Sequence, residues 1–242
     1  MRIAILEEDP TQCDMLRWLL ETAGHKCHPF GTWKTFQTGL YRDSFDLIVL
    51  EWMLPDQSGA HIVHWIRHTL HLSVPVLCIS AHTDEETAVE ALNSGADEFM
   101  CKPIRRNELV ARVNALLRRA YPELNTHDVF HIAGMEFHPK LSTIVCRDTP
   151  QVFTQKEFDL ALLLFQHLDK SISRSHIQEQ VWGRGSDVPS RTLDTHISRV
   201  RTKLGLKPDN GFQLTPVYGF GYKLEKVANK EPKHAARPSI GG

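Results

Sequence analysis

The chain lacks a run of about 20 apolar residues, the length that a membrane-spanning helix needs. Its first apolar stretch, IAIL, is too short for the core of a signal peptide. The five cysteines are scattered and form no CxxC pair, which fits reduced, buried thiols better than a disulfide framework. We therefore expect a cytoplasmic protein that makes no contact with a membrane.

Motifs of common enzyme classes are also missing, because the sequence contains no nucleophile elbow, Walker loop or dinucleotide-binding fingerprint. We therefore expect no enzymatic activity. A length of 242 residues favours two domains. Residues 1–120 carry 12 Lys and Arg against 16 Asp and Glu, whereas residues 121–242 carry 16 against 13. The second half is thus the better candidate for binding nucleic acid.

Residues 1–119 alternate short apolar runs with stretches of helical periodicity. The apolar runs cover 3–6, 25–30, 46–50, 74–79 and 97–101, and they are rich in branched residues. This alternation predicts an α/β domain, a doubly wound, five-stranded parallel sheet. Functional sites of such sheets lie outside the carboxyl ends of the strands.

The remainder of the chain has a different pattern. Residues 120–127 form a predicted linker, and 128–226 a second domain of the α+β class. Strand-like material over 129–153, helices near 155–168, 174–182 and 190–204, and a hairpin at 212–224 predict a winged helix. Residues 227–242, rich in Pro, Lys, Ala and Gly, predict a disordered tail.

Polar residues follow the predicted strands of the first domain. Glu7 and Glu8 end the first strand, Glu51 the third and Ser80 the fourth, and Lys102 follows the fifth. Carboxylates at one sheet edge repel one another unless a divalent cation or a lysine offsets their charge. The set is typical of a phosphoryl-receiving site with magnesium.

The segments MRIAILEED, FDLIVLEWMLPDQSG, VPVLCISA and GADEFMCKP, in this order, resemble the receiver domain of response regulators of the OmpR/PhoB family. The resemblance covers 1–119. It implies a metal site from Glu7, Glu8, Glu51 and the backbone carbonyl of Met53. It further implies that Ser80 and Phe99 are switch residues and that Lys102 pairs with the phosphoryl group.

One residue departs from the family pattern: the phosphoacceptor, an aspartate in the family, is Glu51. The extra methylene moves the carboxylate about 1.5 Å further from the backbone, which misaligns in-line phosphoryl transfer. We therefore expect a receiver that acts without phosphorylation and requires no cofactor, and we leave magnesium binding open. Glu51 either holds an active-like arrangement by reaching Lys102 and Ser80 or forms an ion pair with Lys102 in a degenerate pocket.

Residues 190–204 predict a helix with two distinct faces. Leu193, Ile197, Val200 and Leu204 form one apolar stripe, and the opposite face is polar. Guanidinium and hydroxyl groups suit base edges in a major groove, and flanking cations suit phosphates. The outward residues are Arg191, Thr195, Ser198 and Arg199, and the flanking ones are Thr192, Arg201 and Lys203. This helix is the predicted contact to double-stranded DNA.

The segments TQKEFDLALLL, VWG and VYGFGYKL resemble the winged-helix domain of the same family over 128–226. The resemblance makes helix 190–204 the recognition helix and puts Tyr218 at the wing tip, where many relatives hold an arginine. It also implies RNA polymerase as a partner near Trp182. A homodimer is implied through a receiver face that contains Asp97, Glu98, Glu108, Arg112 and Arg119.

Two other functions stay open at the level of sequence. The receiver could act mainly as a protein-binding signalling adapter, with DNA binding secondary. It could also be a conventional phosphorelay acceptor that uses another residue, such as Asp9 or Asp56.

Overall fold

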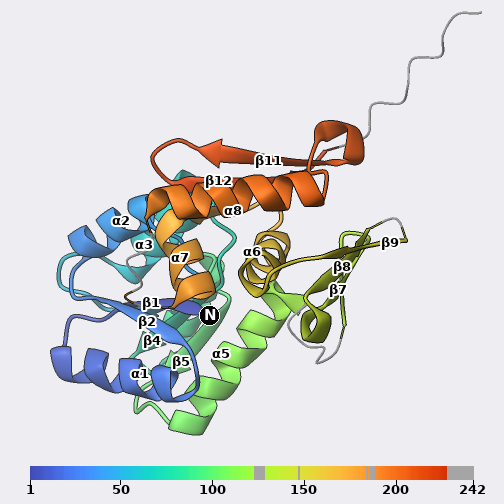
Figure 1. The fold of residues 1–242 in the computed structure, drawn as a ribbon. Coiled ribbons are helices and arrows are strands. Elements are labelled where there is room, and N and C mark those ends of the chain that lie inside the picture. The colour runs from blue at the N-terminus through green and yellow to red at the C-terminus, as the bar shows by residue number, and fades with distance from the viewer. Residues whose placement is uncertain (123–128, 147, 184, 186–188, 228–242) are drawn as a thin grey trace, which may run out of the picture.

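A computed structural model describes residues 1–122, 129–146, 148–183, 185 and 189–227, and Figure 1 shows how they form two domains. The N-terminal domain contains the predicted five-stranded parallel sheet, and the order of its strands is β2-β1-β3-β4-β5. Its strands are β1 Arg2–Leu6, β2 Lys26–Phe30, β3 Leu47–Glu51, β4 Val76–Ser80 and β5 Glu98–Cys101.

Helices cover both faces of this sheet. The first face packs against α1 Pro10–Thr22 and α5 Arg106–Ala120. The other packs against α2 Trp33–Arg42, α3 Gly59–His64, the π-helical turn η1 Trp65–Thr69 and α4 Glu85–Asn93. Side chains of a strand alternate between the faces, so that Ile3 and Ile5 join one apolar core while Ala4 and Leu6 join the other.

The C-terminal domain has the predicted winged-helix arrangement. It begins with an antiparallel four-stranded sheet of β6 Phe130–Ile132, β7 Met135–His138, β8 Thr143–Cys146 and β9 Thr149–Val152. A short 3-10 helix, η3 Pro139–Leu141, joins β7 to β8. Helices α6 Gln155–Gln166, α7 Arg174–Trp182 and α8 Ser190–Lys203 follow, with the short strand β10 Ser171–Ser173 before α7. After the 3-10 turn η4 Pro208–Asn210, the hairpin of β11 Phe212–Val217 and β12 Gly221–Lys226 completes a second sheet of order β10-β12-β11.

The apolar stripe of α8 lies in the core, as its spacing predicted. Leu193, Ile197, Val200 and Leu204 are at most 5% exposed, and they pack with side chains of α6 and the hairpin. Burial of this stripe directs the opposite face of α8 outward.

The end of the first domain packs with its core. Helix α5 runs through Ala120, and Tyr121 packs with the core beneath α1 and α5. Residues 123–127 of the expected linker and 228–242 of the expected tail lie outside the described residues.

The two domains contact each other at the amino edge of the receiver sheet. Arg2, at the start of β1, forms an ion pair with Glu179 of α7 at 2.5 Å. Asp43, before β3, accepts hydrogen bonds from Ser173 and Ser175 of the second domain. Figure 1 shows α7 beside the receiver domain.

Within the described ranges, none of the helices combines the length and the apolar character needed to span a bilayer.

Candidate phosphoacceptor pocket and nucleic-acid interface

Three predicted pocket residues meet at the carboxyl edge of the sheet. Glu51 ends β3, Glu7 follows β1, and both carboxylates are at most 6% exposed. Lys102, just after β5, donates from Nζ to Glu7 Oε2 at 3.0 Å and forms an ion pair with Glu51 Oε2. The backbone N–H of Met53 donates to Glu51 Oε1 at 3.2 Å. The longer acid is therefore held between Lys102 and the loop that follows β3.

The charges of this pocket depend on one another. Burial disfavours the ammonium form of Lys102, but hydrogen bonds and charge from Glu51 and Glu7 outweigh it and raise the pKa of Lys102. Burial, with a smaller contribution from the charge of Glu7, raises the pKa of Glu51, and Lys102 opposes this shift. Two buried carboxylates thus share one lysine.

The residues as placed do not fit a magnesium ion. Of the four candidate ligands, Glu7 and Glu51 both pair with Lys102, and the backbone of Met53 contacts Glu51 through its N–H group. The side chain of Glu8 is exposed. The ammonium group of Lys102 is the cation that offsets these carboxylates.

The resemblance assigned switch roles to Ser80 and Phe99, which belong to the neighbouring strands β4 and β5. Ser80, at the end of β4, is fully buried, and its Oγ accepts a hydrogen bond from the N–H of His82 at 3.0 Å. Phe99 is partly buried against the core under α2, α3 and α4. Among the described residues no hydrogen bond joins Glu51 to Ser80, so Glu51 reaches Lys102 but not Ser80.

The alternative acceptors both have structural partners. Asp9 caps α1 by accepting from the N–H groups of Thr11 at 2.8 Å and Gln12 at 3.1 Å. Asp56 accepts from the N–H of Trp33 at 2.9 Å. Each carboxylate thus stabilises the start of a helix.

The outward face of α8 is available to a ligand. Arg191, Thr195, Ser198 and Arg199 are exposed and line a shallow surface groove together with Asp194. Thr195 donates to the carbonyl of Arg191 at 2.8 Å, which keeps its hydroxyl on the helix. Figure 1 shows α8 running along the outer side of the second domain.

The flanking residues are partly engaged within the domain. Arg201 donates to the carbonyl of Leu214 at 3.0 Å, and Lys203 to Glu157 at 2.9 Å. Thr192 is partly buried. Tyr218, by contrast, is fully exposed at the tip of the β11–β12 hairpin. Arg199 of the central face also forms an ion pair with Glu157, at 3.6 Å. The central face of α8 and the wing tip nevertheless present exposed polar side chains.

Comparison with known proteins covers nearly the whole chain. A family model described as "Response regulator receiver domain" matches residues 3–114, and one described as "Transcriptional regulatory protein, C terminal" matches 148–224. The sensory transduction protein RegX3 of Mycolicibacterium smegmatis is 30% identical over 226 residues, which cover 92% of this chain and 98% of RegX3. The chain belongs to the OmpR/PhoB family of response regulators. Its two domains are those of a two-component response regulator with a DNA-binding transcription-regulator domain.

Other relatives support this assignment to the response regulators. The alkaline phosphatase synthesis transcriptional regulatory protein SphR of Synechococcus elongatus is 31% identical, over 92% of this chain and 90% of SphR. The phosphate regulon transcriptional regulatory protein PhoB of Pseudomonas aeruginosa is 30% identical, over 92% of this chain and 96% of PhoB. These relatives are named as transcriptional regulators, not as enzymes.

The expected dimer face of this response regulator pairs its charges within one chain. Asp97 forms an ion pair with Arg67 at 2.7 Å. Arg112 lies between Glu98 at 2.9 Å and Glu108 at 2.8 Å. Arg119 donates from Nε to the carbonyl of Ala115 at 3.4 Å. The same face also exposes two apolar side chains of α4, Val89 and Leu92, each at 48%.

Sequence reasoning missed two groups of histidines in this response regulator. His167 and His176 meet Asp46 at the domain interface, although Asp46 is more than 120 positions away in the chain. His64 of α3 and His68 of η1, at HxxxH spacing, have exposed side chains whose ring centroids are 4.3 Å apart. The HxxxH spacing of His64 and His68 could be recognised in the sequence, whereas His167 and His176 meet Asp46 only because the two domains pack together.

Proposed function

We propose that this protein is a sequence-specific regulator of transcription whose receiver acts without phosphorylation of its acceptor position. The observation that carries the proposal is the ion pair of Glu51 with Lys102, because it joins the acceptor position to the lysine that the family resemblance assigns to the phosphoryl group. Because Glu51 already pairs with Lys102, no phosphoryl group is required to bring this lysine to the acceptor position.

The geometry disfavours phosphoryl transfer to Glu51 for two further reasons. In-line transfer needs the acceptor oxygen in near-attack alignment, and Glu51 presents one oxygen to Lys102 and the other to the N–H of Met53. Transfer also needs a cation to offset the charge of the phosphoryl group. Glu7 is paired with Lys102 and Glu8 is exposed. We therefore propose that the regulator requires no metal or other cofactor for this function. We also propose that it works in the cytoplasm.

DNA contact is assigned to the exposed face of α8 and to the wing. Arg191 and Arg199 supply guanidinium groups that can read guanine bidentately, while Thr195 and Ser198 supply hydroxyl groups. Tyr218 extends from the hairpin without a charge. Arg201 and Lys203 donate to Leu214 and Glu157, so their role at phosphates is secondary in this proposal.

The active form is proposed to be a homodimer through α4, β5 and α5. Val89 and Leu92 supply exposed apolar surface there, which compensates for charges that pair within one chain. Two recognition helices then reach successive major grooves, so binding is expected at tandem half-sites about one helical turn apart. RNA polymerase is the proposed further partner on the DNA.

Selection of bound fragments from a random DNA pool, using unmodified protein, tests this function. An enriched tandem motif with salt-dependent affinity supports it. Absence of any enriched sequence would favour the signalling-adapter function. Treatment with a small phosphodonor followed by intact-mass measurement tests whether the protein is a conventional phosphorelay acceptor, because such an acceptor would show a stable increase in mass.

A further inference from the structure

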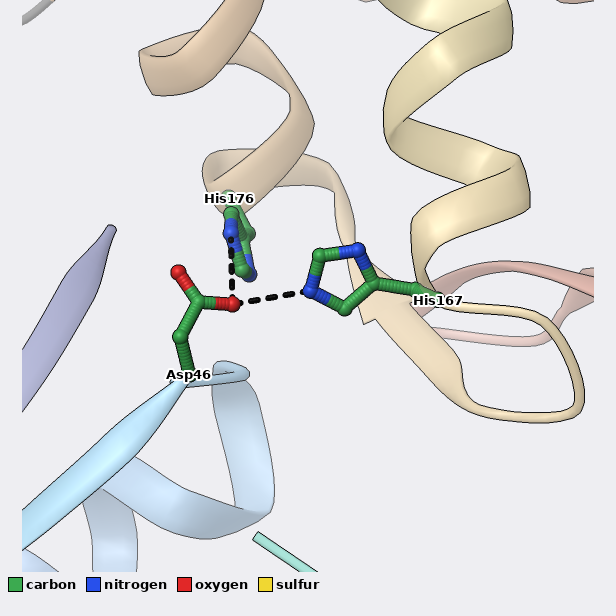
Figure 2. A group of neighbouring side chains, drawn as sticks. All are labelled: Asp46, His167 and His176. Carbon is green, nitrogen blue, oxygen red and sulfur yellow. Dashed lines mark hydrogen bonds and ion pairs between the residues drawn. The ribbon is translucent and has the colours of Figure 1, made fainter. Parts of the chain in front are cut away.

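A cluster of three buried side chains joins the two domains. Figure 2 shows Asp46, which precedes β3, facing His167, which follows α6, and His176 of α7. Their exposed fractions are 1%, 5% and 0%. The carboxylate comes from the receiver domain and both imidazoles come from the C-terminal domain.

The three potential ligand atoms converge on one point. His167 Nε2 lies 2.8 Å from Asp46 Oδ1, and His176 Nε2 lies 3.6 Å from the same oxygen. All three atoms are within 4.8 Å of one another. Ligands about 2.0–2.1 Å from a tetrahedral zinc ion lie roughly 3.3 Å apart, so small side-chain movements suffice to bring these atoms around one ion.

The other polar atoms of the three side chains form hydrogen bonds to groups outside the cluster. His167 Nδ1 hydrogen-bonds the carbonyl of Leu163 at 2.9 Å, which accepts only, so Nδ1 is the donor. His176 Nδ1 lies 2.8 Å from Ser44 Oγ. Asp46 Oδ2 accepts from the N–H of Arg2 at 2.6 Å. Hydrogen bonds of this kind fix the ring orientation of metal-binding histidines. A metal ion at Nε2 of His167 would replace the hydrogen bond of that atom to Asp46.

One atom of the cluster has no adequate partner. His176 Nε2 is completely buried and makes no hydrogen bond to the described residues. A buried polar atom without a partner destabilises the folded protein. The Asp46 carboxylate lies 3.6 Å from this atom, and its negative charge favours a cation bound by both side chains.

We propose that Asp46, His167 and His176 form a binding site for a divalent transition-metal ion, with Zn²⁺ as its ligand. Two imidazoles and a carboxylate are the donors that zinc accepts, whereas magnesium and calcium prefer all-oxygen sites. His167 also lines a cavity of about 310 Å³ between the domains, from which a water molecule can supply a fourth ligand. A bound ion links the receiver to the C-terminal domain through direct coordination bonds.

Titration of the full-length protein with Co²⁺, followed by displacement with Zn²⁺, tests the site. The visible absorption of Co²⁺ reports a low-coordinate nitrogen and oxygen environment, and Zn²⁺ binds such sites more tightly than Co²⁺. We expect one ion per chain in the wild type. His176→Gln and Asp46→Asn should each weaken binding by more than about tenfold. His64→Gln/His68→Gln is the matched control, because it removes an exposed histidine pair and should leave the absorption unchanged.

A second readout needs no variant. Nitrogen NMR of the wild-type imidazoles should show Zn²⁺-dependent shifts at Nε2 of His167 and His176 and little change at the other histidines. Loss of the Co²⁺ signal only in the His64→Gln/His68→Gln protein would overturn the proposal, because binding would then occur at the surface. Equal affinity of wild type and His176→Gln, or no binding to the wild type, would overturn it as well.

Discussion

Replacing Asp43 with Asn tests how strongly the polar domain interface stabilises the protein. The Asp43 carboxylate accepts hydrogen bonds from the guanidinium group of Arg2 at 2.5 and 2.8 Å and from the hydroxyl group of Ser175 at 2.7 Å. It also accepts one from the hydroxyl group of Ser173. Burial favours the neutral acid, but these hydrogen bonds and the charge of Arg2 lower the pKa of Asp43 from 3.8 to about 2. A shift of this size corresponds to up to about 2 kcal/mol of stability at neutral pH, less some solvent screening.

The sign of the shift fixes the pH window. Because the folded-state pKa of Asp43 is depressed, its stabilising contribution is full above about pH 4 and is lost as pH falls through 2. The free energies of unfolding of the wild type and Asp43→Asn, measured in urea, should therefore differ most near pH 6. At pH 3 the part of this difference that comes from the charge of Asp43 should have fallen by roughly half. Asp14→Asn is the control, because Asp14 is exposed and its ion pair with Arg17 is worth little. A gap between wild type and Asp43→Asn that does not change with pH would refute the reasoning.

Three further changes probe the C-terminal domain. A Cβ at Gly221 would lie 2.0 Å from the carbonyl oxygen of Ile172, so Gly221→Ala should lower the free energy of unfolding by roughly 1–3 kcal/mol or more, whereas Gly31→Ala, which meets open space, should not; urea unfolding checks both. Arg199→Ala should weaken operator binding by about 1–3 kcal/mol in a filter or anisotropy titration, and unchanged affinity would argue against a base contact. Tyr218→Arg should steepen the salt dependence of binding by about one unit if the wing tip reaches a phosphate, and an unchanged slope would place it away from DNA.

The sequence was sufficient for the parts of the fold that repeat locally. Alternating apolar runs predicted a five-stranded parallel sheet, and the spacing of Leu193, Ile197, Val200 and Leu204 predicted the buried side of α8. Helix α2 had no such clear signal, because β-branched Thr35 and Thr38 and Gly39 lower its helix propensity. The strand β10 has only three residues, too few to show a period.

The candidate sites divide in the same way. Glu7, Glu51 and Lys102 could be predicted as neighbours, because parallel strands bring their carboxyl ends to one edge. The pairing of Arg112 with Glu98 and Glu108 depends on side-chain packing that spacing does not determine. The domain interface depends on docking of two separately folded cores, so Asp46 gave no local sign of its partners His167 and His176.

Operator titration of the unmodified protein, with and without a small phosphodonor, tests the central claim most directly. The account predicts that wild-type protein binds its operator without phosphodonor and that the phosphodonor changes neither its affinity nor its intact mass. Glu51→Gln, which removes the ion pair with Lys102 at nearly constant shape, should bind more weakly. Wild-type protein that binds only after phosphodonor treatment would contradict the account.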